Sequence, residues 1–263
     1  MSFEETKREV AIGNRVLAHV GFCTGVTASL GHVSLRVPEN PDLFIVKGRG
    51  YAMDAIPAMK AADMIVCDLD GNKVDGPPRA TQCFEVKIHS AIYKRYPSIQ
   101  SVVHVHPRHA VMMSVIGVTL VPMCQEGVNL VRSPLPVFPH SRLVSSDEDG
   151  NTLAELIDGG PAALLLGHGA VTTGSSISAS ILNMIGLEEQ ARMNWLATCA
   201  MGPNHPQIPV ELLEESRYAP PYWELPHFAS SVPADDPRRH GQAPQGENSG
   251  PYQYWASLVE EGV

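Results

Sequence analysis

Three histidines and one glutamate stand out in this sequence because their spacing could build a metal site. His104 and His106 lie two residues apart in an apolar stretch that predicts a short buried strand. Residues i and i+2 of a strand point to the same face, so the two imidazoles would lie side by side at the strand end. His168 ends a second apolar run, and Glu85 opens a predicted helix. Three imidazoles that leave an open position are a common arrangement for a catalytic divalent metal.

This pattern resembles the class II aldolase/adducin superfamily, in which a glutamate opens a helix and an H-x-H pair ends the next strand. A third histidine follows about sixty residues later in an H-G dipeptide. Here the matching residues are Glu85, His104/His106 and His168-Gly169, and the resemblance covers roughly residues 5–200. It implies one divalent metal ion per chain, held by the three histidines, and a proton-transfer role for Glu85. Imidazole ligation suits Zn²⁺ or Mn²⁺, and also Fe²⁺ or Co²⁺.

The substrate side of the pattern departs from the sugar-phosphate aldolases of the superfamily. Those enzymes carry two serines before the glutamate that help to hold a phosphate, and here the positions are Cys83 and Phe84. Their G-N-x-S motif has His32 at the asparagine, and their T-P-S-G turn is replaced by residues that include Lys47 and Arg49. Phe84 suits an aromatic ring better than a phosphate. The three basic side chains could bind a carboxylate, although Lys47 and Arg49 could equally be solvated surface residues.

The composition argues against several classes of partner. The formal net charge is −9, whereas nucleic acids and anionic membranes favour a basic patch. No apolar run approaches the length of a membrane span. The five cysteines are scattered singly, and the N-terminus lacks the basic and apolar regions of a signal peptide. We therefore expect a cytoplasmic protein with free thiols that acts on a small molecule.

Hydrophobic periodicity predicts an alternation of strands and helices. Helices are expected over residues 2–20, 82–96, 110–116, 153–157 and 176–200, and strands over 33–37, 44–46, 64–69, 73–74, 101–106, 119–121 and 163–166. This order indicates the α/β class, as an α/β/α sandwich around a central, largely antiparallel sheet. The resemblance implies the same fold in a C4 homotetramer with active sites at subunit interfaces.

The chain changes character after residue 201. Ten of the 22 prolines follow residue 202, and such a segment is unlike one that builds its own core. We expect residues 1–201 to form the metal-binding catalytic domain. Residues 202–263 would form an extended arm that packs on this domain or on a neighbouring subunit. Aromatic residues near its end could anchor it, and we expect Tyr252 or Tyr254 to approach an active site.

These observations favour a metal-dependent enzyme that breaks a carbon–carbon bond. Apolar neighbours such as Phe84 are expected to raise the pKa of Glu85 toward the working pH of a general acid. His89 and His109 would pack or support the ligands. Within this class we favour a decarboxylase of a hydroxylated aromatic or heteroaromatic acid, and an aldolase for a non-phosphorylated substrate is the alternative. A non-catalytic scaffold like the adducin head is a remote third reading, because that branch lacks the metal ligands that this chain keeps.

Overall fold

A single mixed sheet organises the chain, which the computed structural model describes at residues 3–217, 220–228, 233–236 and 250–263. The strands follow the order β4-β3-β2-β1-β5-β8-β7-β6. β6 and β7 are parallel, and the other neighbouring pairs are antiparallel. The strands span His32–Arg36 (β1), Leu43–Lys47 (β2), Met64–Asp68 (β3), Lys73–Asp75 (β4), Ser101–Val105 (β5), Val137–Phe138 (β6), Ala162–Leu165 (β7) and Gly169–Gly174 (β8).

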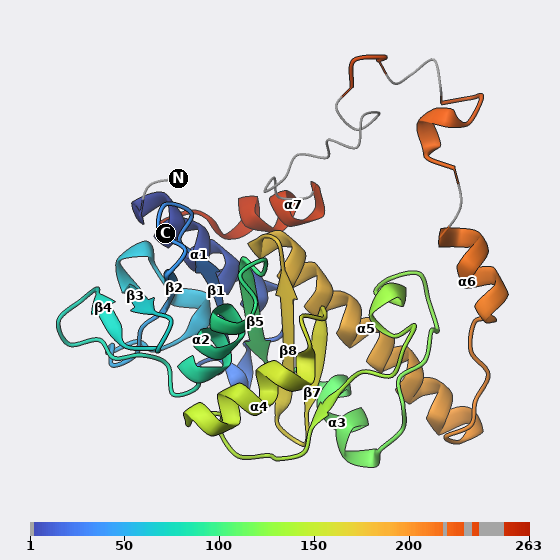
Figure 1. The fold of residues 1–263 in the computed structure, drawn as a ribbon, viewed down its shortest axis with the longest axis horizontal. Coiled ribbons are helices and arrows are strands. Elements are labelled where there is room, and N and C mark those ends of the chain that lie inside the picture. The colour runs from blue at the N-terminus through green and yellow to red at the C-terminus, as the bar shows by residue number, and fades with distance from the viewer. Residues whose placement is uncertain (1–2, 218–219, 229–232, 237–249) are drawn as a thin grey trace.

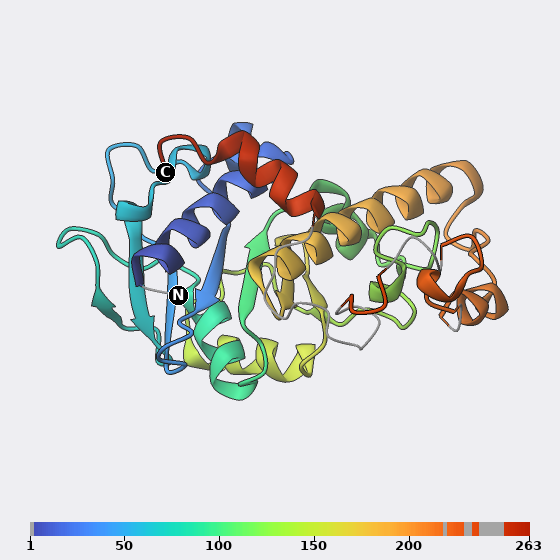
Figure 2. The same cartoon turned by 90° about the horizontal axis from the view of Figure 1, so that it is seen from above.

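Helices cover both faces of this sheet (Figure 1). They span Phe3–His19 (α1), Val86–Arg95 (α2), Arg108–Ile116 (α3), Asp147–Ile157 (α4), Ile177–Met201 (α5), Val210–Arg217 (α6) and Gly250–Val259 (α7). Figure 2 shows α1, α5 and α7 on one side of the sheet and α2 and α4 on the other. The predicted sandwich around a largely antiparallel sheet is therefore confirmed. Within the described ranges, none of the helices combines the length and apolar character that a membrane span needs.

The alternation of strand side chains divides the core into two halves. Val33 and Val103 belong to the half that packs under α1 and α5. Val102 belongs to the half under α2 and α4. Because successive strand residues point to opposite faces, His104 lies on the same face as Val102, and His32 lies on the face opposite Val33. His32 and His104 are Cα partners in the β1–β5 ladder, so both imidazoles lie on the α2 side of adjacent strands.

Two local predictions differ from the structure. The predicted strand over 119–121 does not form. The side-chain amide of Asn194 on α5 accepts from the Val121 N–H at 3.0 Å and donates to the Val121 carbonyl at 2.8 Å. These are the backbone groups that a neighbouring strand would have bonded, so no ladder is needed there. Conversely, hydrophobic periodicity did not predict β8, although its residues Val171, Thr172 and Thr173 are β-branched and favour a strand.

The segment after α5 is helical in places rather than extended throughout. α6 is held to the loop between α3 and β6, since the Arg132 guanidinium donates to the Leu213 carbonyl at 3.1 Å and to the Glu214 carboxylate at 3.3 Å. Residues 218–219, 229–232 and 237–249 of the predicted arm lie outside the described residues. The boundary at residue 202 stays a prediction.

α7 packs against α1 of the same chain. Tyr252 is buried in the core half that includes α1, with 1% of its surface exposed. The Arg15 guanidinium of α1 donates to the carbonyls of Val259, Glu261 and Gly262. A single α1 side chain therefore holds the backbone at the C-terminal end of α7.

Candidate metal centre

The end of β5 and the turn between β7 and β8 bring the three histidines together. His104 lies within β5, and His106 follows that strand by one residue. Since β8 pairs with β5, the turn that carries His168 lies beside the end of β5. The ring centroids of the three histidines are 4.9–5.1 Å apart. The structure thus gathers all three residues that the sequence predicted as metal ligands.

Hydrogen bonding orients the His104 ring and leaves one nitrogen for a cation. Its Nδ1 lies 3.1 Å from the Ala170 carbonyl oxygen, which can only accept, so Nδ1 carries the proton. In the neutral ring, Nε2 is then an acceptor, 3.3 Å from Nε2 of His106 and 3.1 Å from Oε2 of Glu85. Two imidazoles on one zinc ion, at about 2.0–2.1 Å and with tetrahedral angles, have their nitrogens roughly 3.3 Å apart. The observed spacing suits a shared ion.

His168 is a second indication of an ion. Its side chain is buried, and neither ring nitrogen meets the criteria for a hydrogen bond among the described residues, although Nε2 lies 3.4 Å from Oε1 of Glu85. Buried polar side-chain atoms usually have a partner. One ligand atom from each of Glu85, His104, His106 and His168 lies within 4.8 Å of the others. We call these four residues the metal cluster, and their donor set fits a divalent cation.

The protonation state of His106 also suits metal binding. Burial, together with the neighbouring imidazoles of His104 and His168, lowers the pKa of His106 to about 3. The ring is therefore neutral at neutral pH, and neutral imidazole is the form that binds a metal.

Glu85 is the N-cap residue of α2, and its Oε1 accepts from the Val144 N–H at 3.1 Å. Burial on its own would raise the pKa of Glu85, but the imidazoles of His104 and His168 outweigh burial and hold the pKa below its ordinary value. The predicted upward shift is therefore wrong. Its physical reason is that Phe84 is 62% exposed, so the neighbours that act on the carboxylate are imidazoles rather than an apolar ring.

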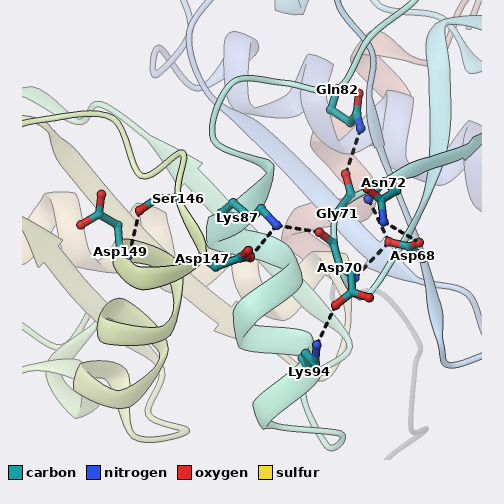
Figure 3. Close-up of polar contacts among 10 residues, drawn as sticks. All are labelled: Asp68, Asp70, Gly71, Asn72, Gln82, Lys87, Lys94, Ser146, Asp147 and Asp149. Carbon is teal, nitrogen blue, oxygen red and sulfur yellow. Dashed lines mark hydrogen bonds and ion pairs between the residues drawn. The ribbon is translucent and has the colours of Figure 1, made fainter.

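Contacts at the starts of α2 and α4 hold the segment that carries Glu85 (Figure 3). Gln82 donates from Nε2 to the Gly71 carbonyl in the β3–β4 turn at 3.0 Å. Lys87 donates to a carbonyl of the same turn at 2.7 Å, and its Nζ lies 2.5 Å from Oδ1 of Asp147 on α4. These contacts bracket Glu85 in the sequence, so they fix the backbone from which its side chain reaches the histidines.

Gly169 explains why a glycine follows the third histidine. A Cβ at this position would lie 2.6 Å from the Val105 carbonyl oxygen and 2.9 Å from Cε1 of His104. Real Cβ atoms essentially never come this close to another atom. The glycine therefore lets β8 approach β5 closely enough for His168 to meet the other two rings.

A small pocket of about 60 Å³ lies beside the metal cluster. Its lining includes His32, Arg49, Cys83, Phe84, Glu85 and His106. The Arg49 guanidinium carbon lies 4.3 Å from the centroid of the Phe84 ring, which is within cation–π range. Burial raises the pKa of the Cys83 thiol to about 12, so it is a neutral group at neutral pH. The pocket thus combines the Phe84 ring and the Arg49 cation with Glu85 and one predicted ligand, His106.

Lys47 does not line this pocket, in contrast to the prediction that it would bind substrate. Its side chain is 1% exposed, and its Nζ lies 2.9 Å from Oδ1 of Asp54. Arg49 approaches the other oxygen of the same carboxylate, with Nε 3.3 Å from Oδ2. Asp54, which the sequence did not single out, therefore neutralises Lys47 in the interior and leaves Arg49 as the cation at the pocket.

Tyr252 also lies away from the metal cluster. It belongs to the core half under α1, whereas His104 faces α2 and α4, so the sheet separates them. Its burial in its own chain does not support the predicted contact with a substrate. Tyr254 is 62% exposed and remains available to another subunit.

The two further histidines have separate partners. His109 contacts Glu188 of α5, with Nδ1 2.7 Å from Oε1. His89 of α2 lies within hydrogen-bond distance of His32 and of Ser34, each at 2.7 Å. Ser34 is the serine of the G-N-x-S motif, but the sequence predicted no role for it, because its contact with His89 depends on the register of β1 against β5 and on the face that α2 presents.

Comparisons with known proteins point to one family. The family described as Class II Aldolase and Adducin N-terminal domain matches residues 8–195. A 3,4-dihydroxyphthalate decarboxylase from Arthrobacter keyseri is 29% identical over 205 residues, which are 74% of this chain and 80% of that protein. The protein of the same name from Terrabacter sp. (strain DBF63) is 30% identical over 213 residues, 77% of this chain and 84% of its own. An L-ribulose-5-phosphate 4-epimerase UlaF from Salmonella typhi is 28% identical over 207 residues, 74% of this chain and 86% of its own.

Solved structures show the same fold. An L-fuculose 1-phosphate aldolase from Glaciozyma antarctica PI12 superposes with a TM-score of 0.70 at 21% identity, over 98% of this chain and 88% of that chain. An aldolase II superfamily protein from Pseudomonas syringae gives a TM-score of 0.71 at 22% identity, over 87% and 89% of the two chains.

Proposed function

Because the chain belongs to the Class II Aldolase and Adducin N-terminal domain family, we propose that it is a divalent-metal-dependent carbon–carbon lyase. Its substrate is a hydroxylated aromatic or heteroaromatic mono- or dicarboxylic acid, from which it removes CO₂. The metal is one Zn²⁺ or Mn²⁺ ion per chain, with Fe²⁺ or Co²⁺ as further candidates.

The observation that carries the proposal is the convergence of three imidazoles and one carboxylate on one point. His168 has no hydrogen-bond partner for either ring nitrogen among the described residues, and the His104–His106 nitrogen spacing of 3.3 Å suits ligation. A scaffold protein has no need of such a group beside an open pocket. This argues against the adducin-like reading.

The residues of the metal cluster divide the chemistry between them. A divalent ion held by His104, His106 and His168 would polarise a substrate oxygen and stabilise the electron pair left when the carbon–carbon bond breaks. Glu85 is ionised at neutral pH, so it first accepts the proton of the substrate hydroxyl. Glu85 then returns this proton to the ring carbon that bears the carboxylate, which converts the ring to a cyclohexadienone. The bond to the carboxylate breaks, its electron pair restores the aromatic phenolate, and CO₂ leaves.

The pocket supports an aromatic acid over a sugar phosphate. Phe84 offers a ring surface, and Arg49 and His32 are the basic side chains of its lining. Cys83 and Phe84 replace the serines that the resemblance associates with phosphate binding. The relatives named as 3,4-dihydroxyphthalate decarboxylases support the same substrate class.

The size of the pocket supports an active site completed by another subunit. A volume of about 60 Å³ is far below the roughly 300–1,000 Å³ of ordinary ligand sites. Phe84 and Leu143, which line it, are 62% and 48% exposed in the single chain. A neighbouring chain in a homotetramer would cover these apolar side chains and close the pocket. Light scattering of the purified protein should give the mass of four chains, and a monomer would contradict this part of the proposal.

Aldol cleavage of a non-phosphorylated hydroxy-carbonyl compound is the alternative reaction. It leaves the same kind of electron pair beside the metal, so the metal cluster alone does not distinguish it from decarboxylation. The two reactions differ in the substrate that the pocket must bind, and its aromatic and basic lining favours the aromatic acid.

The test is incubation of the metal-loaded protein with a panel of hydroxyaryl carboxylates in heavy water, beginning with 3,4-dihydroxyphthalate. We expect CO₂ release and one deuterium on the ring carbon that carried the carboxylate. An aldehyde product from a hydroxy-carbonyl panel, without CO₂ from any aryl acid, would move the assignment to the aldolase.

A further inference from the structure

Four buried side chains connect the pocket wall to the interior of the protein. The Tyr93 hydroxyl lies 2.7 Å from Oγ of Ser34, and the same Oγ lies 2.7 Å from Nδ1 of His89. Nε2 of His89 lies 2.7 Å from Nδ1 of His32, which lines the pocket. All four side chains are at most 4% exposed. We call them the hydrogen-bond chain, and the proposed reaction does not yet use it.

The short distances identify this group as hydrogen-bonded rather than metal-binding. His32, His89 and Cys83 are close enough together to be considered as ligands. Two imidazole nitrogens on one zinc ion would be roughly 3.3 Å apart, as in the His104–His106 pair. The 2.7 Å between His32 and His89 instead matches an N–H donor facing a nitrogen acceptor.

The geometry limits where the protons of the two imidazoles lie. A distance of 2.7 Å between Nε2 of His89 and Nδ1 of His32 needs a proton on one of the two facing nitrogens and none on the other. Burial lowers the pKa of His89 to about 3, so this ring is neutral at neutral pH and carries one proton, on one of its two nitrogens. The position of those protons depends on the direction in which the hydroxyl groups donate.

Tyr93 sets that direction. Its hydroxyl has two acceptors within reach, Oγ of Ser34 at 2.7 Å and the Gln100 carbonyl at 3.3 Å. Hydrogen bonds from hydroxyl to oxygen are typically about 2.5–3.0 Å long, so the contact with Ser34 is the stronger of the two. The Gln100 carbonyl also accepts from the Arg36 N–H at 2.8 Å. The shorter contact favours donation from Tyr93 to Ser34.

The remaining protons follow from this first donation. Ser34 uses its own proton to donate to Nδ1 of His89, so His89 carries its proton on Nε2. That N–H donates to Nδ1 of His32. His32, which lines the pocket, must then carry its proton on Nε2, the ring nitrogen that does not face His89.

We propose that Tyr93, Ser34 and His89 are positioning residues that hold His32 as the Nε2–H tautomer, so that it donates a hydrogen bond to an anionic oxygen of the substrate. The identity of that oxygen, a carboxylate of an aryl acid, rests on the proposed function. The tautomer itself does not. Fixing the ring in advance makes it a donor without a charge of its own, which suits a site beside a metal ion.

Nitrogen NMR of the zinc-loaded, ¹⁵N-histidine-labelled protein tests the proposal directly. Long-range proton–nitrogen correlation separates a protonated ring nitrogen from an unprotonated one, and the His32→Gln variant assigns the His32 signals by their loss. We expect Nε2 of His32 to be protonated and Nδ1 to be unprotonated. The opposite pattern in the wild-type protein would overturn the proposal.

The variants Ser34→Ala and Tyr93→Phe test whether the chain controls the tautomer. Ser34→Ala should convert the single tautomer of His32 into a mixture, and Tyr93→Phe should do so to a smaller extent. Ser101→Ala is the matched control, because Ser101 is an equally buried serine of the neighbouring strand that bonds the Ser34 carbonyl and Ser180 instead. Its His32 signals should match the wild type. If the His32 tautomer is unchanged in Ser34→Ala, the hydrogen-bond chain does not determine it, and this part of the proposal is wrong.

Kinetics of the same variants connect the tautomer to the reaction. A hydrogen bond to a charged oxygen corresponds to roughly 10–100-fold in affinity, so Ser34→Ala should raise KM for an aryl carboxylate by up to that factor, with kcat changed less. Absence of CO₂ release from every acid in the panel would overturn the proposed reaction and leave the NMR result standing. An Nδ1–H tautomer in a fully active enzyme would overturn only this inference.

Discussion

The metal cluster and the hydrogen-bond chain are neighbouring groups of histidines whose ring nitrogens have different kinds of partner. His32 and His104 are Cα partners in adjacent strands, and their ring centroids are 5.6 Å apart. The closest nitrogens are 3.3 Å apart between His104 and His106, but 2.7 Å apart between His89 and His32. A difference of 0.6 Å separates a site for a shared ion from a hydrogen bond.

This difference shows that the groups around its ring nitrogens decide whether a buried imidazole binds a cation or takes part in a hydrogen bond. In the hydrogen-bond chain, hydroxyl groups supply a proton at one end, so both nitrogens of His89 and Nδ1 of His32 each have a donor or an acceptor. In the metal cluster the fixed neighbours are acceptors, the Ala170 carbonyl and the Glu85 carboxylate. A group of acceptors that face one another needs a cation between them.

The largest effect should come from removing a ligand. His104→Ala, His106→Ala and His168→Ala should each reduce bound zinc from one equivalent per chain to near zero and abolish activity, measured by metal analysis and CO₂ release. His140→Ala is the control, because His140 is an exposed histidine outside both groups. Retention of one full equivalent by all three variants would contradict the assignment. Two equivalents of zinc per chain in the wild type would mean that the hydrogen-bond chain also binds a cation, which would contradict the comparison.

The next effect separates proton transfer from metal binding. Glu85→Gln keeps an oxygen that can accept from the Val144 N–H, so the segment should keep its position. We expect near-normal zinc content with kcat lowered by roughly 10²–10⁴, as for loss of a general acid or base. Zinc content and single-turnover CO₂ release measure the two effects separately. A variant with wild-type turnover would remove Glu85 from the mechanism.

A smaller effect should follow from crowding the metal cluster without touching a ligand. In Gly169→Ala the new methyl group would collide with the Val105 carbonyl and the His104 ring, so we expect a loss of about 1–3 kcal/mol in unfolding free energy and weaker zinc binding. Denaturant unfolding and a competition titration measure these. Gly250→Ala, where a Cβ meets nothing within 4 Å, should change neither.

The smallest effect concerns acid stability of the hydrogen-bond chain. The unfolded chain protonates His89 near its ordinary pKa of 6.5, whereas the folded protein does not until about pH 3. Stability therefore falls as the pH drops below 6.5, by at most about 1.4 kcal/mol per pH unit for this group. His89→Gln should make the unfolding free energy of the metal-free protein less sensitive to pH between 6.5 and 5. His140→Gln should keep the wild-type slope, and an equal slope in both variants would assign the acid sensitivity to other groups.

The metal cluster could be predicted from the sequence because it depends on local geometry. His104 and His106 share a strand face at any register, and the H-G dipeptide marks His168. The largely antiparallel sheet and most helices followed from periodicity for the same reason. Where a side chain replaced a strand partner, as Asn194 does at Val121, periodicity predicted a strand that does not form.

The hydrogen-bond chain could not be predicted, because each of its links crosses between elements. Its existence depends on the β1–β5 register, which pairs His32 with His104, and on the face of α2 that carries His89 and Tyr93. Lys47 shows the same limit. Its charge predicted a substrate contact, but the position of Asp54 in the folded chain directs it inward.

The packing of α7 on α1 has a consequence for the order of synthesis. Glu9 of α1 and Tyr252 of α7 are close enough to interact electrostatically, although they are separated by almost the whole chain. At about 5–20 residues per second, a ribosome needs roughly 10–50 s to add the residues between them. During that interval the apolar surface of α1 that Tyr252 will cover is open to other nascent chains and to chaperones. Although α1 leaves the ribosome long before α7, it is therefore fully enclosed only after α7 has been made.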